Sequence, residues 1–367
     1  MDSPLADGND SDHIAVMADV SNIPDRATTL PLALTMGEPA GVGPELSLDA
    51  WMRLRNSGPP FVLFADPDLM TDVARKIGRD VAIAVAGSVA EAASRFRSAL
   101  PVMPVELAKA VRPGKPDPAN ASAVIRSIEL AVAAARRGEA GAVVTNPIQK
   151  ASLYAAGFPH PGHTEFLGEI AGTGIVPVMM LASPELRVVP VTIHVALRDA
   201  LDAINSDAIV ETAKTVVNAL RWDFGIQDPR IAVAGVNPHA GEDGAMGDED
   251  SRIVAPAVER LRNAGIAVVG PMSPDTMFTA RARRTYDAAI CMYHDQALIP
   301  IKTLDVDGGV NVTLGLSVVR TSPDHGTALD IAGKGIADPG SLVAAIRMAD
   351  MIARNRSKER QDAQARR

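Results

Sequence analysis

Short apolar runs alternate with segments of helical periodicity from about residue 30 to about residue 350. Residues 121–138, ASAVIRSIELAVAAARRG, carry apolar side chains at helical spacing and end in a glycine suited to a helix C-cap. The strand-like runs are LPLALTM (30–36), PFVLFAD (60–66), DVAIAVAG (80–87), GAVVTNP (141–147), LRVVPVTIH (186–194), RIAVAGVNPH (230–239), YDAAICMYH (286–294) and GVNVTLGL (309–316). This alternation predicts an α/β fold in which helices cover a largely parallel or mixed sheet.

The composition excludes several classes of protein. A chain of 367 residues predicts two domains or one large α/β unit. A net charge of −8 and only 3% aromatic residues argue against a nucleic-acid partner. No run reaches the roughly 18 apolar residues of a membrane span. The single cysteine, Cys291, excludes disulfides and cysteine-rich zinc sites, and it fits a reducing cytoplasm.

The two ends of the chain differ from its body. Residues 1–28 hold six aspartates against one arginine and lack a basic n-region. We therefore expect a disordered acidic extension rather than a signal peptide. Residues 356–367 form a polar, net basic tail after a predicted helix.

Three of the strand-like runs end in a histidine, namely His194, His239 and His294. In open α/β sheets the ligand crevice lies beyond the carboxyl ends of the strands, so the three imidazoles could converge there. A lone histidine in such a position is most often structural, but three in the same topological position favour a ligand role. Three imidazoles with an open coordination position describe a catalytic divalent-metal site, because a structural zinc would have a fourth protein ligand.

Polar residues follow each histidine and leave two interpretations open. They are Arg198-Asp199, Glu242-Asp243 and Asp295-Gln296. Such groups could orient the imidazoles through hydrogen bonds. They could equally be solvated loop charges.

Other stretches suit an anionic ligand. In HPGHTEFL (160–167), His163 and Thr164 stand at a predicted loop-to-helix start, where free N–H groups favour phosphate. Lys302, Asn311 and Arg320 lie in or beside an otherwise apolar strand region, and they would suit a substrate that carries phosphate and carboxylate. Ordinary surface cations are the alternative.

Two further stretches are rich in glycine. Residues 37–46, GEPAGVGPEL, lack both the third glycine of a dinucleotide loop and a Walker lysine, so they are either a tight strand-to-helix turn or a ligand loop. Residues 324–339, DHGTALDIAGKGIADP, contain too many small and polar residues for a core segment and predict an irregular ligand loop.

Together these motifs resemble a known family. TMGEPAGVGPE, GHTEFL, NPHAGED, YHDQALIPIK, GVNVTLGL and RTSPDHGTALDIAGKG are similar to the 4-hydroxythreonine-4-phosphate dehydrogenases of vitamin B6 (pyridoxine) biosynthesis, in order from about residue 30 to about residue 350. The 324–339 loop also resembles the adenosine-binding loop of isopropylmalate and isocitrate dehydrogenases. These enzymes bind NAD without a Rossmann fingerprint.

The resemblance implies an isocitrate/isopropylmalate dehydrogenase-like fold, with two α/β/α lobes around a cleft. Residues 29–150 and about 305–355 would form the first lobe, which carries the cofactor loop. Residues 151–304 would form the second lobe, with the metal histidines and the dimer contacts. The expected assembly is a homodimer with a shared active site.

The resemblance also assigns roles to individual residues. The metal ligands would be His194, His239 and His294, and the metal would be zinc, magnesium, cobalt or manganese. The substrate contacts would be His163, Thr164, Lys302, Asn311 and Arg320. The cofactor, NAD with NADP as the alternative, would contact His325, Gly326, Thr327 and Asp330. Lys302 and Asp295 are the candidates for the proton acceptor.

The implied reaction is a metal-dependent oxidation of 4-phosphohydroxy-L-threonine at C3, followed by decarboxylation to 3-amino-2-oxopropyl phosphate. A related dehydrogenase that acts on 4-phospho-D-threonate shares the same motifs and remains an alternative. A metal- or anion-binding protein without turnover is a second alternative, but the 324–339 loop argues against it.

Overall fold

The computed structural model describes residues 30–158, 163–171, 176–305 and 308–365. The predicted acidic extension at residues 1–28 lies outside the described residues.

The strands agree closely with the predicted apolar runs, and further strands join them. The strands are β1 (Leu32–Thr35), β2 (Phe61–Ala65), β3 (Ile83–Val85), β4 (Leu100–Pro104), β5 (Val143–Val144), β6 (Val178–Ala182), β7 (Arg187–Pro190), β8 (Arg230–Ala234), β9 (Ala267–Met272), β10 (Ala288–Cys291), β11 (Val310–Leu314) and β12 (Arg320–Pro323).

Helices fill most of the connections between these strands. The α-helices are α1 (Gly43–Leu54), α2 (Pro67–Lys76), α3 (Val89–Arg95), α4 (Ala121–Arg136), α5 (Lys150–Ala155), α6 (His163–Ala171), α7 (Leu197–Ala203), α8 (Ser206–Trp222), α9 (Ala255–Asn263), α10 (Pro274–Met277), α11 (Ala280–Arg283), α12 (His294–Leu304) and α13 (Gly340–Ala365). Short helical turns are η1 (Pro118–Asn120), η2 (Pro238–Gly244) and η3 (Asp250–Val254).

Within the described residues the strands form one mixed sheet of twelve strands. Their order is β3-β4-β2-β1-β5-β12-β11-β6-β7-β10-β8-β9. The strands from β3 to β12 in this order run parallel, and so do β7, β10, β8 and β9. Strand β11 is antiparallel to both of its neighbours, and β6 is antiparallel to β7.

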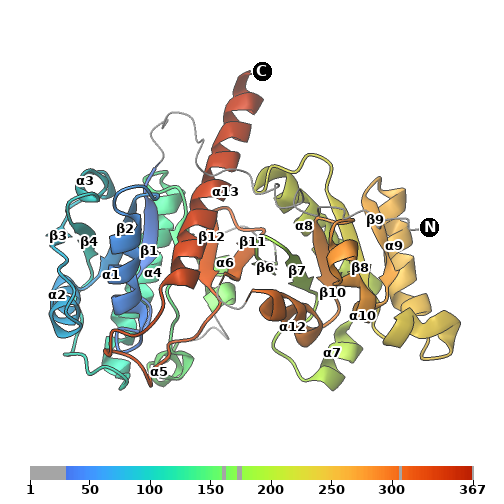
Figure 1. Cartoon of the computed structure of the whole chain (residues 1–367), viewed down its shortest axis with the longest axis horizontal. Coiled ribbons are helices and arrows are strands. Elements are labelled where there is room, and N and C mark those ends of the chain that lie inside the picture. Colours follow the sequence, from blue (N-terminus) through green and yellow to red (C-terminus); the bar gives the residue numbers. More distant parts are fainter. Residues whose placement is uncertain (1–29, 159–162, 172–175, 306–307, 366–367) are drawn as a thin grey trace, which may run out of the picture.

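This order separates the chain into two blocks of neighbouring strands. The strands from β3 to β11 in the order come from the predicted first lobe, and those from β6 to β9 come from the predicted second lobe. Figure 1 shows the blocks as two lobes, with α13 between them. The exact lobe boundaries remain a prediction.

Strand β10 shows why the second lobe has three layers. Successive side chains of a strand point to opposite faces of the sheet. Ala288 and Ile290 belong to one hydrophobic cluster, which includes buried residues of α8 and α9. Ala289 and Cys291 belong to another, with buried residues of α10 and α12. The sheet is therefore covered on both faces, and this confirms the predicted α/β class.

The cysteine and the C-terminal tail fit into this architecture as follows. Cys291 is fully buried, and burial raises the pKa of its thiol well above the usual range, so it serves as core packing. The segment predicted as a tail after a helix instead continues α13 as far as Ala365. None of the helices in the described part of the chain is both long and apolar enough to cross a membrane.

Candidate active site

The three predicted metal ligands follow three strands that are neighbours in the sheet. Strand β10 lies between β7 and β8 and is parallel to both. The strands end at Pro190, Ala234 and Cys291, earlier than the sequence runs suggested, because the chain then leaves the sheet. His194, His239 and His294 therefore stand in the connections beyond the carboxyl ends of these strands.

His194 and His294 lie side by side. Their ring centroids are 5.7 Å apart with an angle of 45° between the ring planes. Both side chains line a cavity of about 270 Å³, together with Thr192, Tyr293 and Asp295 among others. His294 is the first residue of α12, so the strand end and the helix start together fix its position.

Asp295 contacts the imidazole of His294. Asp295 Oδ1 lies 2.7 Å from His294 Nδ1, at hydrogen-bond distance. A carboxylate that accepts the Nδ1 proton leaves Nε2 with its lone pair exposed, which is the form that binds a metal. The predicted polar neighbours of His194 and His239 are exposed, as Asp295 is: Arg198-Asp199 and Glu242-Asp243.

His239 stands apart from this pair. It begins a run of six residues with positive φ that ends at Gly244, the last residue of the turn Pro238–Gly244. Asp275 lies near it, and the pKa of Asp275 is lowered first by a hydrogen bond from the Ser273 hydroxyl and then by the charge of His239. Among the described residues no group of three His, Cys, Asp or Glu side chains is close enough together to hold a metal.

Arg320 is a buried cation without a carboxylate partner in the described part of the chain. Its side chain donates to Thr145 Oγ1 at 2.7 Å and to Thr313 Oγ1 at 2.9 Å, and the residue is only 4% exposed. Burial lowers the pKa of the guanidinium to about 10. An isolated buried charge is costly to a fold, so this arrangement suits a site that receives an anion.

Asn311 points to the same face of the sheet as Arg320. In the antiparallel pair of β11 and β12, Asn311 is opposite Ser322 and Thr313 is opposite Arg320. Opposite residues in such a pair share a face, as do residues two apart on one strand. Asn311 therefore stands two residues along β11 from the hydroxyl that contacts Arg320.

Lys302 occupies the last turn of α12, the helix that begins at His294. Its Nζ lies 2.8 Å from Asp324 Oδ2, and Asp324 directly follows β12. One helix thus joins the histidine pair to Lys302, and one ion pair joins Lys302 to the predicted cofactor loop.

The predicted cofactor loop is irregular, as expected, and packs against the other glycine-rich stretch. Thr327 O accepts a hydrogen bond from Val42 N at 3.0 Å. A Cβ at Gly41 would lie 2.8 Å from Thr327 O, so glycine permits this close approach. His325 Nε2 is buried without a hydrogen-bond partner among the described residues. Gly326 and Asp330 are exposed.

Helix α6 begins at His163, so the helix predicted after this point is confirmed, and the residues of the predicted loop at 160–162 lie outside the described part of the chain. The side chains of His163 and Thr164 lie outside the described part of the structure.

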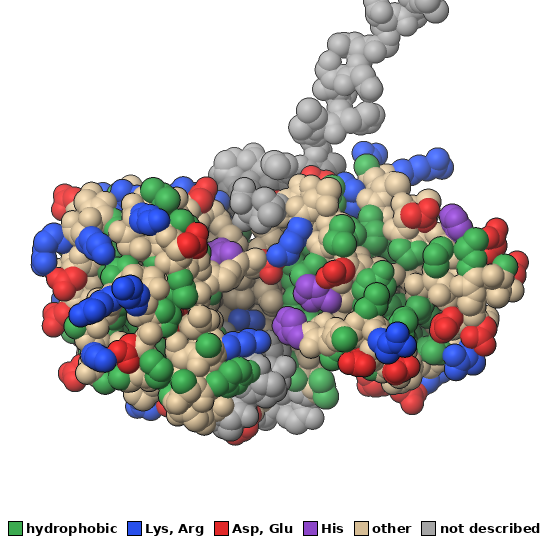
Figure 2. All heavy atoms as spheres, turned by 90° about the horizontal axis from the view of Figure 1, so that it is seen from below, with side chains coloured by type: hydrophobic (Ala, Val, Ile, Leu, Met, Phe, Trp, Pro, Cys, Tyr) green, Lys and Arg blue, Asp and Glu red, His purple; other side chains and the backbone are tan. Residues whose placement is uncertain are grey.

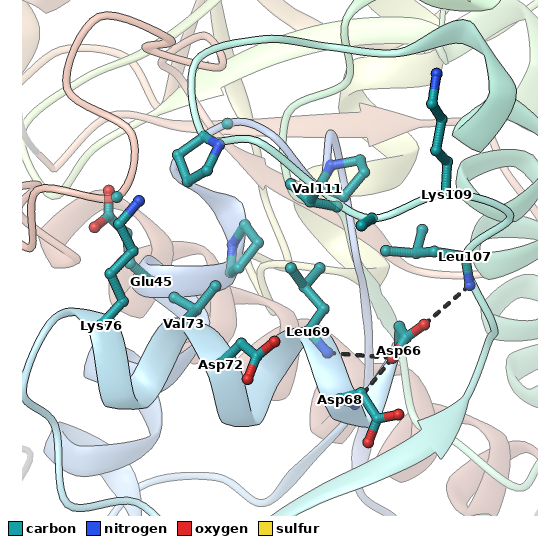
Figure 3. A pocket seen from close by; sticks show the side chains of 16 residues that line it. Glu45, Asp66, Asp68, Leu69, Asp72, Val73, Lys76, Leu107, Lys109 and Val111 are labelled. Carbon is teal, nitrogen blue, oxygen red and sulfur yellow. Dashed lines mark hydrogen bonds between the residues drawn. The ribbon is translucent and has the colours of Figure 1, made fainter.

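A second cavity, of about 340 Å³, lies on the first lobe beside Gly41 and Gly333 (Figure 3). At one end, the carboxylate of Asp66 accepts hydrogen bonds from Leu69 N at 3.2 Å and Leu107 N at 3.0 Å. None of the predicted metal, substrate or cofactor residues lines this cavity, so its walls do not mark it as the reaction centre.

Figure 2 shows a hollow between the two halves of the molecule. Histidine side chains lie on its walls and basic side chains lie close by. The groups that hold Arg320 and Lys302 were not predicted as site residues: Thr145, Thr313 and Asp324. Hydroxyl groups of this kind carry no recognisable spacing.

Comparison with known proteins identifies the family. The family model for pyridoxal phosphate biosynthetic protein PdxA matches residues 57–349. The chain belongs to the PdxA family.

Individual relatives support this assignment. A 4-hydroxythreonine-4-phosphate dehydrogenase from Bradyrhizobium diazoefficiens is 53% identical over 334 residues, which cover 88% of this chain and 97% of that protein. The crystal structure of the enzyme of that name from Klebsiella pneumoniae superposes with a TM-score of 0.79 at 38% identity, over 89% of this chain and 100% of that one. A terephthalate 1,2-cis-dihydrodiol dehydrogenase from Burkholderia xenovorans LB400 is less similar, with a TM-score of 0.60 at 30% identity, over 88% and 98% of the two chains.

These matches confirm the resemblance inferred from the motifs. They also confirm the isocitrate/isopropylmalate dehydrogenase-like fold and the assignment of the chain to the oxidoreductases of this family.

Proposed function

We propose that this PdxA-family protein oxidises 4-phosphohydroxy-L-threonine at C3 with NAD and decarboxylates the product to 3-amino-2-oxopropyl phosphate. The observation that carries the proposal is the buried guanidinium of Arg320, which has only hydroxyl partners in the described residues. A substrate with phosphate and carboxylate groups supplies the missing anion. Relatives that are 4-hydroxythreonine-4-phosphate dehydrogenases support the choice of substrate.

We assign the substrate contacts to five residues. Arg320, Asn311 and Lys302 offer two cations and an amide around β11, β12 and the end of α12. His163 and Thr164 at the start of α6 complete the set. Asp324 keeps the Lys302 ammonium in place before the substrate arrives, which limits the entropy lost on binding.

We assign the divalent metal to His194, His239 and His294. The donor set fits, because three imidazoles leave a coordination position open for substrate. His194 and His294 are adjacent, whereas His239 does not join them in a group of three ligands within the described residues of one chain. When bound, the ion would acidify the C3 hydroxyl and polarise the ketone that precedes decarboxylation. The geometry does not choose among zinc, cobalt, manganese and magnesium, although imidazole ligands favour a transition metal.

The roles of Asp295 and Lys302 follow from their partners. Asp295 accepts a hydrogen bond from His294 Nδ1, which supports an orienting role. Lys302 is held as an ammonium by Asp324, which supports binding of an anionic group. Either residue would have to exchange its present partner before it could accept the hydroxyl proton.

The cofactor site would be formed by His325, Gly326, Thr327 and Asp330. Asp330 is exposed and suits the ribose hydroxyls of NAD, which favours NAD over NADP. Replacing Gly41 with alanine would press a Cβ against Thr327 O, so we expect weaker thermal protection by NAD in this variant. Gly87→Ala is the matched control, because its Cβ would meet only the end of the Glu91 side chain, at 3.6 Å.

The same thermal experiment separates the enzyme from a protein that only binds metal or anions. NAD should raise the melting temperature of the wild type, and the absence of any rise with or without metal would favour the binding protein. To separate substrates, kcat/KM is compared for 4-phosphohydroxy-L-threonine and 4-phospho-D-threonate. A higher value for the second would assign the chain to the D-threonate branch. A homodimer and a cytoplasmic location complete the proposal.

A further inference from the structure

The side-chain amide of Gln296 joins the ends of two neighbouring strands. Its Oε1 accepts a hydrogen bond from Met292 N at 2.6 Å, and its Nε2 donates to Gly235 O at 2.8 Å. Met292 directly follows β10, and Gly235 directly follows β8. Gln296 is only 7% exposed. Its buried amide is satisfied, because the carbonyl oxygen and the amino group each have a hydrogen-bond partner.

A third strand is tied to the same point. Thr192 stands two residues beyond the end of β7. Its Oγ1 donates to Met292 O at 2.9 Å, and its backbone N–H donates to the same oxygen at 3.3 Å. A continuous line of hydrogen bonds therefore runs from Thr192 through Met292 and Gln296 to Gly235.

This line crosses the sheet where the strands separate. The pairing of β8 with β10 ends at Val233 and Ile290. Beyond that pair, the amide of Gln296 accepts a hydrogen bond from the segment that follows β10 and donates one to the segment that follows β8. A peptide group inserted between the two segments would make the same two hydrogen bonds. The Gln296 side chain thus fixes the distance between these two segments, which no longer pair directly with each other.

The three residues whose backbone takes part in these hydrogen bonds each precede a predicted metal ligand in the sequence: Thr192, Met292 and Gly235. Thr192 precedes His194 by two residues, and Met292 precedes His294 by two. Gly235 precedes His239 by four, and the residues between them are held by the buried carboxylate of Asp250. That carboxylate accepts hydrogen bonds from Val236 N at 2.7 Å and Asn237 N at 3.0 Å.

We propose that Gln296 is a positioning residue of the histidine site, because its amide sets the spacing of the connections that carry the three imidazoles. The proposal rests on the proposed metal-dependent function. It differs from a purely structural role, in which the amide would only close the end of the sheet. Gln296 does not touch substrate or metal, and it acts through the backbone of Met292 and Gly235.

Three variants separate these roles. Gln296→Met keeps the length and most of the volume but removes both hydrogen bonds. Gln296→Glu keeps an acceptor for Met292 N and loses the donor to Gly235 O. Thr192→Val is nearly isosteric and removes only the Oγ1 hydrogen bond, so it tests the line even if the Gln296 variants do not fold.

Ser127→Ala is the matched control in the other lobe. Ser127 Oγ donates to Phe64 O at 2.7 Å and accepts from Met36 N at 2.9 Å, so it also joins two strands through a buried side chain. Its loss should lower the melting temperature without any effect on the histidines.

The first measurement is the affinity for Co²⁺, from calorimetry and the visible absorption of the bound ion. We expect Gln296→Met to bind Co²⁺ roughly 10- to 100-fold more weakly than the wild type, the usual cost of a lost outer-shell partner. Thr192→Val should show a smaller loss, and Ser127→Ala should match the wild type. Unchanged Co²⁺ affinity in folded Gln296→Met and Thr192→Val would overturn the proposal.

The second measurement needs no metal, so it tests the inference even if the proposed function is wrong. NMR of the imidazole nitrogens should show displaced His194 and His294 resonances in Gln296→Met and Gln296→Glu, and unchanged ones in Ser127→Ala. A wild type that binds no Co²⁺ would contradict the metal-dependent function alone. Unchanged imidazole resonances in the Gln296 and Thr192 variants would contradict the positioning role.

Discussion

Lys302 Nζ lies 2.8 Å from Asp324 Oδ2, and this ion pair joins the end of α12 to the first residue of the predicted cofactor loop. Helix α12 begins at His294, so the proposed metal, substrate and cofactor regions are connected through one helix and one contact. Asp324 is mostly buried, with its side chain 17% exposed, whereas that of Lys302 is 42% exposed. The carboxylate is thus the fixed partner and the ammonium is the group presented to solvent.

Asp324→Asn should therefore raise the KM for the phosphorylated substrate with a smaller effect on kcat. A half-exposed ion pair contributes up to about 1 kcal/mol of interaction free energy. If all of it helps to position Lys302 for substrate binding, its loss raises KM roughly fivefold. Steady-state kinetics measure the change. Asp207→Asn, which removes an exposed partner of Arg260, is the control and should leave KM unchanged. Equal KM values for Asp324→Asn and the wild type would contradict the role given to the pair.

Arg320→Met should lower kcat/KM by roughly 100-fold or more, because a desolvated contact with an anion is lost. Its effect on stability should be small, at most about 1 kcal/mol, since the variant removes an uncompensated buried charge together with its hydrogen bonds to two hydroxyls. Urea unfolding and kinetics on the same preparation measure both quantities. A loss of about 3 kcal/mol or more in stability with intact kcat/KM would instead mark Arg320 as a structural residue.

The pH dependence of stability offers a separate test of Arg320. Burial lowers its pKa from the ordinary value of an arginine to about 10 in the folded protein, so the unfolded chain holds this proton to higher pH. The destabilising effect of the buried cation is therefore fully present below about pH 10 and is lost as the pH rises from there toward the ordinary pKa of an arginine. The stability of the wild type relative to Arg320→Met should rise across this window. A flat difference between the two unfolding free energies would contradict the assigned shift.

Asp295→Asn tests whether this carboxylate orients His294 or takes part in proton transfer. If it orients the ring, metal affinity should fall about 10- to 100-fold, and excess metal should restore kcat. If it is the proton acceptor, kcat should stay low at saturating metal. Metal titration of steady-state activity distinguishes the two results, and the account predicts the first.

Much of this fold could be predicted because the apolar runs are short, distinct and separated by helical patterns. The run around Ala288–Cys291 is a buried strand, and residues 121–138 contain helix α4 with Gly138 at positive φ after its end. Strand ends were less predictable. The chain leaves the sheet at Pro190, Ala234 and Cys291 although apolar residues continue, because departures from a sheet are set by tertiary contacts rather than by local composition.

The site could be predicted in its residue types and less in its geometry. Parallel strand topology placed His194 and His294 in neighbouring connections, and their rings are adjacent. The left-handed turn that contains His239 has no signature in NPHAGED, since four of its six positive-φ residues are not glycine. The partners of Lys302 and Arg320 could not be predicted either. Asp324 comes close to Lys302, and Thr145 comes close to Arg320, only in the folded chain.

The central claim is a metal-dependent oxidation with decarboxylation, and its most direct test is product stoichiometry. Purified protein is incubated with 4-phosphohydroxy-L-threonine, NAD and a divalent metal, and NADH and CO₂ are quantified in parallel with a chelated sample and with His239→Ala. The account predicts equal amounts of NADH and CO₂ from the wild type, and neither product from the chelated sample or from folded His239→Ala. Equal turnover with and without chelator, or NADH without CO₂, would contradict it.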